Sequence, residues 1–155
     1  PAVRKSIKDV TEADQSVELV GTIVQVFDPK FFEVCPTCNK RSKPNESGSV
    51  VCPEHGPVTP TWSMVGNAFL DDGTGNIRVV FFRNQLERLT KKSADQLLAY
   101  REVPEKFEEV KTELLGNMVK ISGRASKNQF FDRLEFVAQF VQPADAQEEL
   151  ARLKA

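Results

Sequence analysis

Hydrophobic and polar residues alternate in several short segments of the chain, and this alternation predicts a β-rich protein. The first segment, residues 17–27, is rich in β-branched side chains, and Gly21 in its middle predicts a bend in a long strand. A turn rich in Gly and Asp follows the second segment, as expected for a hairpin. The four later segments with a strand pattern are residues 61–70, 77–82, 118–125 and 130–142.

Between the third and fourth predicted strands the hydrophobic period changes to that of helices. Ser93 and Gln96 form a capping-box pattern, which predicts a helix start. Phe107, Val110 and Leu114 then repeat at helical spacing. Three strands, a helical segment and two more strands are the order of the OB-fold, a small five-stranded barrel. The sequence therefore predicts an all-β barrel with helices, in a β-rich α+β class.

All three cysteines and the only histidine of the chain fall between residues 35 and 55. They form the pattern Cys35-x2-Cys38 followed by Cys52-x2-His55, which is the spacing of a tetrahedral zinc site. Four protein ligands leave no open coordination position, so we expect one structural Zn²⁺ rather than a catalytic ion. Unrelated buried cysteines are another interpretation, and so is a redox C-x-x-C motif, which leaves Cys52 and His55 unexplained.

These patterns divide the chain into a barrel and a terminal helix. We expect the barrel over residues 1–142, with a zinc-ribbon insertion at residues 31–60 between its first and second strands. Pro143 is expected to open a helix over residues 143–155. The apolar residues that form one stripe on this helix are Ala146, Leu150 and Leu153.

The composition excludes several classes of protein. With 155 residues, of which 40% are hydrophobic and 28% charged, the chain is typical of a soluble globular domain. No run approaches the ~18 apolar residues of a membrane span. Thiols committed to a metal favour a reducing, intracellular compartment. The chain opens with Pro1 instead of methionine, from which we expect a processed start or a longer parent protein.

The net charge of −1 does not by itself favour a nucleic-acid partner. Basic and acidic residues are nevertheless segregated along the chain, which permits a cationic face on a nearly neutral protein. Taken singly, each cluster is better interpreted as a solvated surface. One basic cluster begins within the third strand and consists of Arg78, Arg83, Arg88, Lys91 and Lys92.

Two aromatic positions indicate how such a face would bind nucleic acid. Alternation along residues 77–82 directs Arg78, Val80 and Phe82 away from the barrel interior. Bases of a single strand stack on such a ring at ~1–3 kcal/mol each, and the guanidinium meets phosphate or a base face. In the other interpretation, Phe82 packs under the helix that follows.

The second aromatic position is the turn between the fourth and fifth strands. Phe130 and Phe131 are consecutive there, so only one of them can face the core, and Lys127 and Arg133 flank them. In OB-folds this turn borders the oligonucleotide groove. Trp62, just after the insertion, either stacks on a base or packs against the loop or the core.

No enzyme site is predicted. His55 is assigned to the metal, so no histidine remains as a general base. The glycine-rich turn at residues 73–75 precedes a strand rather than the helix that a phosphate loop requires. We therefore expect neither catalysis nor a small-molecule substrate.

The run from Trp62 to Phe82, preceded by the Cys35 to His55 ligand pattern, resembles the C-terminal DNA-binding domain of the large subunit of replication protein A. The archaeal form is the more similar, and the resemblance extends from about Ser6 to Val141. It implies a zinc-bearing OB-fold that coats single-stranded DNA (ssDNA) in replication, recombination and repair, in the cytoplasm and associated with the nucleoid. One departure is His55, because eukaryotic members usually have cysteine there.

The resemblance also implies roles for individual residues. Phe82 stacks on a base, Arg78 occupies a position at which related OB-folds contact DNA, and Phe130 or Phe131 supplies a second stack. The stripe on the terminal helix packs with helices of two smaller OB-fold subunits. The full predicted nucleic-acid-binding set is Trp62, Arg78, Phe82, Arg83, Lys127, Phe130, Phe131 and Arg133.

Two alternatives stay open from the sequence. In the first, the domain chiefly assembles a trimer through its terminal helix and binds DNA weakly, which the nearly neutral charge favours. In the second, it is an RNA-binding protein with a zinc ribbon and an OB-fold, because stacking platforms accept either sugar.

Overall fold

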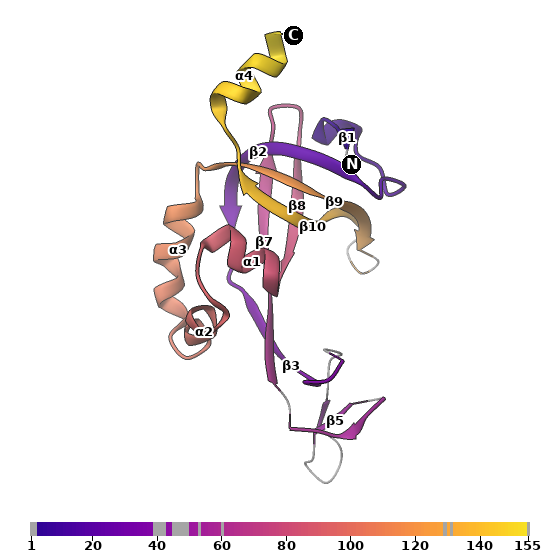
Figure 1. Ribbon diagram of the computed structural model, residues 1–155, viewed down its shortest axis with the longest axis vertical. Coiled ribbons are helices and arrows are strands. Elements are labelled where there is room, and N and C mark those ends of the chain that lie inside the picture. The colour runs from indigo at the N-terminus through magenta and orange to yellow at the C-terminus, as the bar shows by residue number, and fades with distance from the viewer. Residues whose placement is uncertain are drawn as a thin grey trace.

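The computed structural model describes residues 3–38, 43–44, 50–52, 54–59, 61–128, 130 and 132–154. Within these residues, one seven-stranded sheet forms a barrel, and a three-stranded sheet lies in an arm that extends from it (Figure 1). The strands are β1 (Val3–Arg4), β2 (Val17–Val26), β3 (Lys30–Val34), β4 (Lys43–Pro44), β5 (Val50–Cys52), β6 (Gly56–Pro57), β7 (Thr61–Asp71), β8 (Asn76–Phe82), β9 (Met118–Asn128) and β10 (Arg133–Pro143). The helices are α1 (Arg83–Thr90), α2 (Ala94–Leu98), α3 (Phe107–Leu114) and α4 (Ala146–Lys154), with short 3₁₀ turns at Ile7–Asp9, Ala99–Arg101 and Pro104–Lys106.

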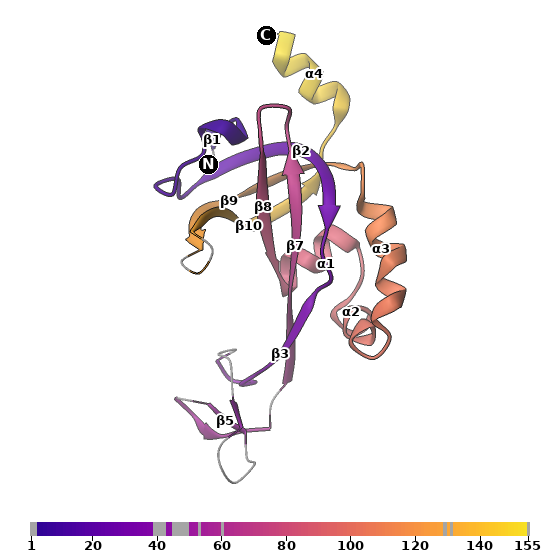
Figure 2. The ribbon, with the colours of Figure 1, turned by 180° about the vertical axis from the view of Figure 1, so that it is seen from behind.

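Strand β2 closes the barrel because it pairs with two different strands. Its first half runs antiparallel to β9 and its second half antiparallel to β7, where Ile23 lies opposite Leu70. Gly21 lies next to the change of partner, and a Cβ atom there would lie 2.8 Å from the carbonyl oxygen of Asp71. The predicted bend at Gly21 is seen as the arch of β2 in Figures 1 and 2. Its cause is the close approach of two backbones.

The remaining strands complete the predicted five-stranded barrel. β8 pairs antiparallel with β7 and parallel with β10, and β10 pairs antiparallel with β9. The turn between the last two strands differs from the prediction, in which the strands covered residues 118–125 and 130–142. β9 continues to Asn128 and β10 begins at Arg133, because the ladder between the two strands extends to the pair Asn128 and Arg133.

The barrel interior and the helices share one hydrophobic core. Three phenylalanines from different elements are at most 2% exposed: Phe81 of β8, Phe107 of α3 and Phe136 of β10. Burial of a side chain of this size contributes about 1.5–3 kcal/mol. α2 begins at the predicted capping box, where Ser93 Oγ accepts a hydrogen bond from the backbone N–H of Gln96. α3 buries its predicted apolar stripe against the same core.

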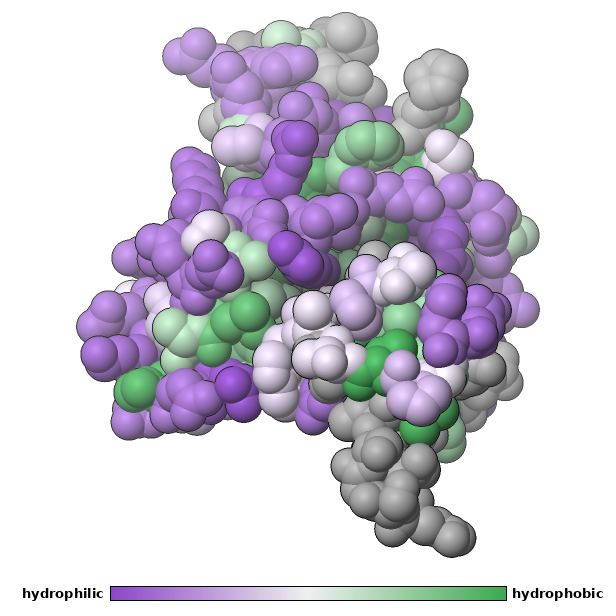
Figure 3. Space-filling view, turned by 60° about the horizontal axis from the view of Figure 1, so that its bottom comes forward, coloured by the Kyte–Doolittle hydropathy of each residue, from purple (hydrophilic) through white to green (hydrophobic). Residues whose placement is uncertain are grey.

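A two-stranded extension of the sheet carries the arm. β3 lies antiparallel to the start of β7, from the pair Lys30 and Val65 to the pair Val34 and Thr61. Residues 30–34 are therefore a strand, and the predicted insertion begins inside it. The small sheet of β4, β5 and β6 lies at the far end of the arm from the barrel (Figures 1 and 2). Seen from that end, hydrophobic and near-neutral residues occupy the middle of the surface, and hydrophilic residues border them (Figure 3).

The C-terminal helix begins later than predicted. Pro143 is the last residue of β10, so the prediction that it opens the helix is wrong. Asp145 caps α4 instead, because its Oδ1 accepts from the N–H groups of Gln147 at 2.9 Å and Glu148 at 3.2 Å, and proline has no such acceptor. α4 points away from the barrel at the end opposite the arm (Figure 1). None of the described helices is long and apolar enough to cross a membrane.

Candidate metal centre and nucleic-acid interface

The four predicted metal ligands come together in the arm. Cys35 Sγ lies 3.6 Å and Cys52 Sγ lies 3.5 Å from His55 Nδ1, and Cys38 Sγ lies 3.6 Å from Cys52 Sγ. All four ligand atoms lie within 4.8 Å of one another. Two thiolates at about 2.3 Å from a tetrahedral ion are roughly 3.7 Å apart, so the cluster has the size of a site for one metal ion.

Backbone hydrogen bonds lower the pKa of two of the cluster's thiols. Burial acts to raise the pKa of Cys35 and Cys52, but hydrogen bonds from backbone N–H groups outweigh it, and both pKa values fall below the ordinary value. For Cys35 the donors are the N–H groups of Cys38 and Thr37. The balance favours the thiolate, which is the form that binds metals. Cys35 and Cys52 are buried and His55 is exposed, so the cluster is open to solvent on the histidine side.

On the barrel, burial confirms the predicted alternation along residues 77–82. Ile77, Val79 and Phe81 are at most 5% exposed, whereas Phe82 is 48% exposed. Phe82 therefore stands at the surface rather than under α1, which begins at the next residue. We call the side of the barrel that carries it the outer face. In register, this face consists of Val65, Asn67 and Phe69 of β7, Arg78, Val80 and Phe82 of β8, and Glu135 and Val137 of β10.

Arg78 lies in the middle of the outer face and is packed into it. Its Nε donates to Asn67 Oδ1 at 3.1 Å, and its guanidinium lies 4.3 Å above the ring of Phe27 and 5.9 Å from that of Phe69. Burial, followed by the nearby charge of Arg133, lowers the pKa of Arg78. The guanidinium is thus a packed part of the outer face and also carries a positive charge there.

These neighbours of Arg78 were not among the predicted site residues. Phe69 had a signal in the alternation of its strand, because it has the opposite parity to Met64 and Leu70. Phe140 was missed too: it is 71% exposed and follows a bulge in β10 after Ala138. A bulge shifts the alternation of a strand, so the sequence pattern alone gave no signal for it.

The turn between β9 and β10 presents one of the two predicted rings. Phe130 is 95% exposed, and its backbone N–H donates to Asn128 Oδ1 at 3.0 Å. Phe131 lies outside the described residues. Of the flanking cations, Lys127 pairs with Asp132 at 2.9 Å and Arg133 with Glu135 at 3.4 Å.

Two other predicted residues do not belong to the outer face itself. Arg83 is the first residue of α1, with its side chain 52% exposed, and pairs with Glu87 at 3.5 Å one turn later. Trp62 is half-buried under Arg101, whose guanidinium lies 4.1 Å from the ring centroid. Trp62 has the opposite strand parity to Val65, so it faces away from the outer face. Trp62 thus packs against another part of the same chain, at Arg101.

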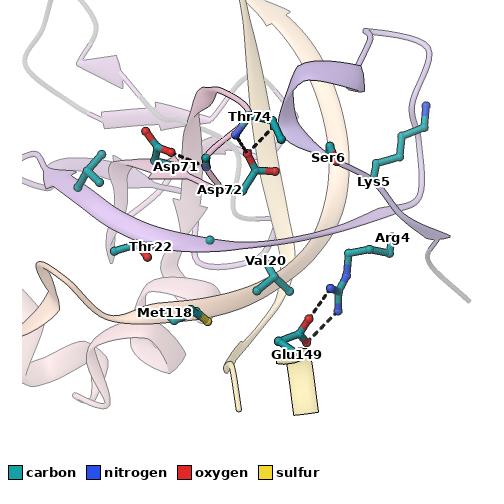
Figure 4. A pocket seen from close by; sticks show the side chains of 13 residues that line it. Arg4, Lys5, Ser6, Val20, Thr22, Asp71, Asp72, Thr74, Met118 and Glu149 are labelled. Atoms are coloured by element: carbon teal, nitrogen blue, oxygen red, sulfur yellow. Dashed lines mark hydrogen bonds and ion pairs between the residues drawn. The ribbon is translucent and has the colours of Figure 1, made fainter. Parts of the chain in front are cut away.

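A groove of about 700 Å³ lies at the end of the barrel near α4. Its walls come from β1, β2, the turn between β7 and β8, and α4 (Figure 4). Glu149 of α4 reaches across it to Arg4 of β1. In the predicted stripe of α4, Leu150 is 52% exposed. Ala146 and Leu153 belong to the same helix, but their side chains are outside the described part.

Among the comparisons with known proteins, only solved structures match the chain, and three of them agree on the fold. No protein-family model and no curated protein sequence matches the chain. A solved replication protein A heterotrimer bound to ssDNA aligns with a TM-score of 0.78 and 19% identity, over 99% of this chain and 39% of that one. Yeast replication protein A bound to ssDNA aligns with a TM-score of 0.72 and 19% identity, over 99% of this chain and 95% of that one.

A third solved structure that aligns with the chain is an OB-fold domain. The second OB-fold domain of replication protein A from Methanococcus maripaludis aligns with a TM-score of 0.51 and 15% identity, over 92% of this chain and 96% of that one. The chain has an OB-fold. The predicted OB-fold with a cysteine and histidine cluster between the first two barrel strands, β2 and β7, is thereby confirmed. At these identities the likeness establishes the OB-fold alone, and the chain spans only 39% of the length of the first structure.

Proposed function

We propose that this chain is a ssDNA-binding OB-fold domain of a replication protein A complex, acting in DNA replication, recombination and repair. The observation that carries the proposal is the outer face, where Phe82 is 48% exposed at the end of a row of packed side chains. Such a ring gains about 1–3 kcal/mol when a base stacks on it. Two of the compared structures hold the same fold with ssDNA bound, which supports the proposal.

On the outer face, the residues that would stack on bases and the residues that would bind phosphates lie at different places. β10 leads from the turn that carries Phe130 to the pair Glu135 and Arg78, and β8 continues from Arg78 to Phe82. The two exposed rings thus lie at the two ends of the face, with Arg78 between them. Bases stack on the rings, while Arg83, Lys127 and Arg133 at the rim meet the phosphates. In this proposal the chain is not an enzyme and acts in the cytoplasm with the nucleoid.

We also propose Zn²⁺ as the ion of the arm. Three thiolates and one imidazole are a soft tetrahedral set, which zinc prefers. The described arm residues Val34, Cys35 and Cys52 are buried but are not part of the barrel core. Coordination would therefore supply the stability that a hydrophobic core supplies elsewhere.

The helix α4 is proposed to join this domain to two smaller OB-fold subunits. Glu149 turns toward the barrel with its side chain 13% exposed, while Leu150 is 52% exposed. An amphipathic helix usually buries its apolar side on its own domain, whereas α4 attaches by an acidic residue. This orientation leaves Leu150 accessible to a partner. It also supports α4, which begins after Pro143 and not at Pro143 as predicted, as an assembly unit beside the barrel.

The first experiment is a fluorescence-anisotropy titration of the zinc-loaded domain with labelled oligo-dT at low and moderate salt. Micromolar or tighter binding that weakens with salt supports DNA coating. No binding even at low salt favours the second candidate, in which α4 assembles a trimer and other domains bind DNA. Competition with RNA of the same sequence tests the third, because preferential binding of RNA would replace ssDNA as the ligand.

A further inference from the structure

Glu135 is an acidic side chain in the middle of the face that is proposed to meet phosphates. It lies on β10, opposite Arg78 of β8 in the parallel ladder. Its side chain is 14% exposed, so it is part of the floor of the face rather than its rim. A carboxylate in such a place repels a polyanion, and its position therefore requires an explanation.

Glu135 is shared by the arginines on either side. Its Oε2 accepts from Arg133 Nε at 3.4 Å and lies 3.8 Å from Arg78 Nε. Its Oε1 accepts from Asn128 Nδ2 at 3.4 Å. One carboxylate thus faces two cations and an amide. These are the groups that also bind the oxygens of a phosphate.

The charges of this cluster depend on one another. Burial, and then the neighbouring charge of Arg133, lower the pKa of Arg78, whereas Glu135 acts to raise it. Without Glu135, two like charges would face each other on a partly buried surface. A phosphate has the charge and the acceptor geometry to compensate them in the same way. A phosphate bound here would therefore replace Glu135 at the arginines.

We propose that Glu135 competes with the backbone phosphates of the bound strand for Arg133 and Arg78, and so limits affinity. The proposal rests on the proposed function, because it assumes that a nucleic acid occupies the outer face. Arg133 exchanges first, since its side chain is 38% exposed against 17% for Arg78. Arg78 stays stacked on Phe27, where it holds the floor of the face in place.

The test compares the wild type with Glu135→Gln, which keeps the size of the side chain and removes its charge. Each additional ion pair with a phosphate of single-stranded DNA steepens the dependence of log K on log salt by about 0.7. At about 50 mM salt, one released arginine therefore tightens oligo-dT binding roughly fivefold to tenfold. The control is Glu108→Gln on α3, which removes the same charge from a pair with Lys111. It is expected to change the affinity by less than about twofold.

A double variant tests whether Glu135→Gln acts through Arg133. In an Arg133→Gln background, Glu135→Gln should lose most of its effect, because the arginine that it releases is absent. Unchanged or weaker binding by Glu135→Gln, in a protein with a wild-type circular dichroism spectrum, overturns the competition. If Glu135→Gln does not fold, Glu135→Asp withdraws the carboxylate from both arginines and should tighten binding in the same direction. A wild type that binds no oligo-dT overturns the proposed function itself, and the inference with it.

Discussion

Arg4 and Glu149, at opposite ends of the chain, form a bidentate ion pair. Arg4 Nη1 donates to Glu149 Oε2 at 2.6 Å and Nη2 to Oε1 at 3.1 Å. The same guanidinium donates from Nε to Glu18 Oε1 of β2 at 2.8 Å. These contacts, the hydrogen bond to Glu149 above all, raise the pKa of Arg4. The first strand of the sheet thus holds the last helix (Figure 4).

Arg4→Ala should loosen α4 without unfolding the barrel. The pair is part-buried at the surface, and pairs of this kind contribute only about 0–1 kcal/mol to global stability. Hydrogen exchange of the α4 amides should therefore become faster, while the denaturant midpoint changes little. Lys5→Ala is the matched control, because it breaks the ion pair with Asp14 and leaves α4 untouched. Unchanged exchange in α4 would show that the contact to Lys120, at 3.8–4.0 Å, is sufficient.

Phe82→Ala should weaken ssDNA binding and leave the fold intact. Loss of one stacking ring costs about 1–3 kcal/mol of binding free energy, and an exposed ring contributes little to the core. Anisotropy titration with oligo-dT measures the loss. The control is Leu115→Ala after α3, because Leu115 is 46% exposed, close to the 48% of Phe82. Equal affinities of the Phe82 variant and the wild type would remove the stacking role.

Removal of the metal should unfold the arm and spare the barrel. The barrel core does not include Val34, Cys35 or Cys52. A chelator should therefore raise hydrogen exchange in the described arm residues, while the barrel strands stay protected. Elemental analysis of the untreated protein should give one zinc per chain. Global unfolding upon chelation would show that the barrel depends on the arm.

Asp72→Asn should flatten the loss of stability in acid. Asp72 Oδ2 accepts from Ile7 N–H at 2.8 Å, and Oδ1 accepts from Thr74 N–H at 2.9 Å. Burial acts to raise the pKa of Asp72, but these hydrogen bonds outweigh it and lower the pKa. A lowered pKa in the folded state gives stability that is present above the ordinary carboxyl pKa of about 4 and is lost as pH falls through the folded value.

Urea unfolding between about pH 5 and about pH 2 measures this contribution. The wild type should lose more free energy of unfolding over this range than Asp72→Asn does. Asp95→Asn, on α2, removes a carboxylate at an exposed site and serves as the control. Parallel curves for the wild type and Asp72→Asn would contradict the prediction.

Much of the fold could be predicted from the local periodicity of hydrophobic and polar residues. The barrel strands, the capping box at Ser93 and the outward parity of Phe82 follow from spacing along the chain, because strand and helix periods are properties of neighbouring residues. The four metal ligands were predictable for the same reason, since each C-x2-C or C-x2-H unit is a local knuckle. The start of α4 was misplaced because Asp145 caps the helix after the ladder of β10 has run on to Pro143.

The surroundings of Arg78 and of α4 depend on contacts between distant segments. Arg78 lies between Phe27 after β2, Asn67 of β7 and Glu135 of β10, and Arg4 meets Glu149 from the far end of the sequence. No period along the chain encodes such contacts, because strand pairing and barrel closure bring them about. The amino-acid sequence thus determined which residues are chemically able to bind a metal or stack on a base. The closed barrel determined which of them share a face, and which arginine is packed rather than exposed.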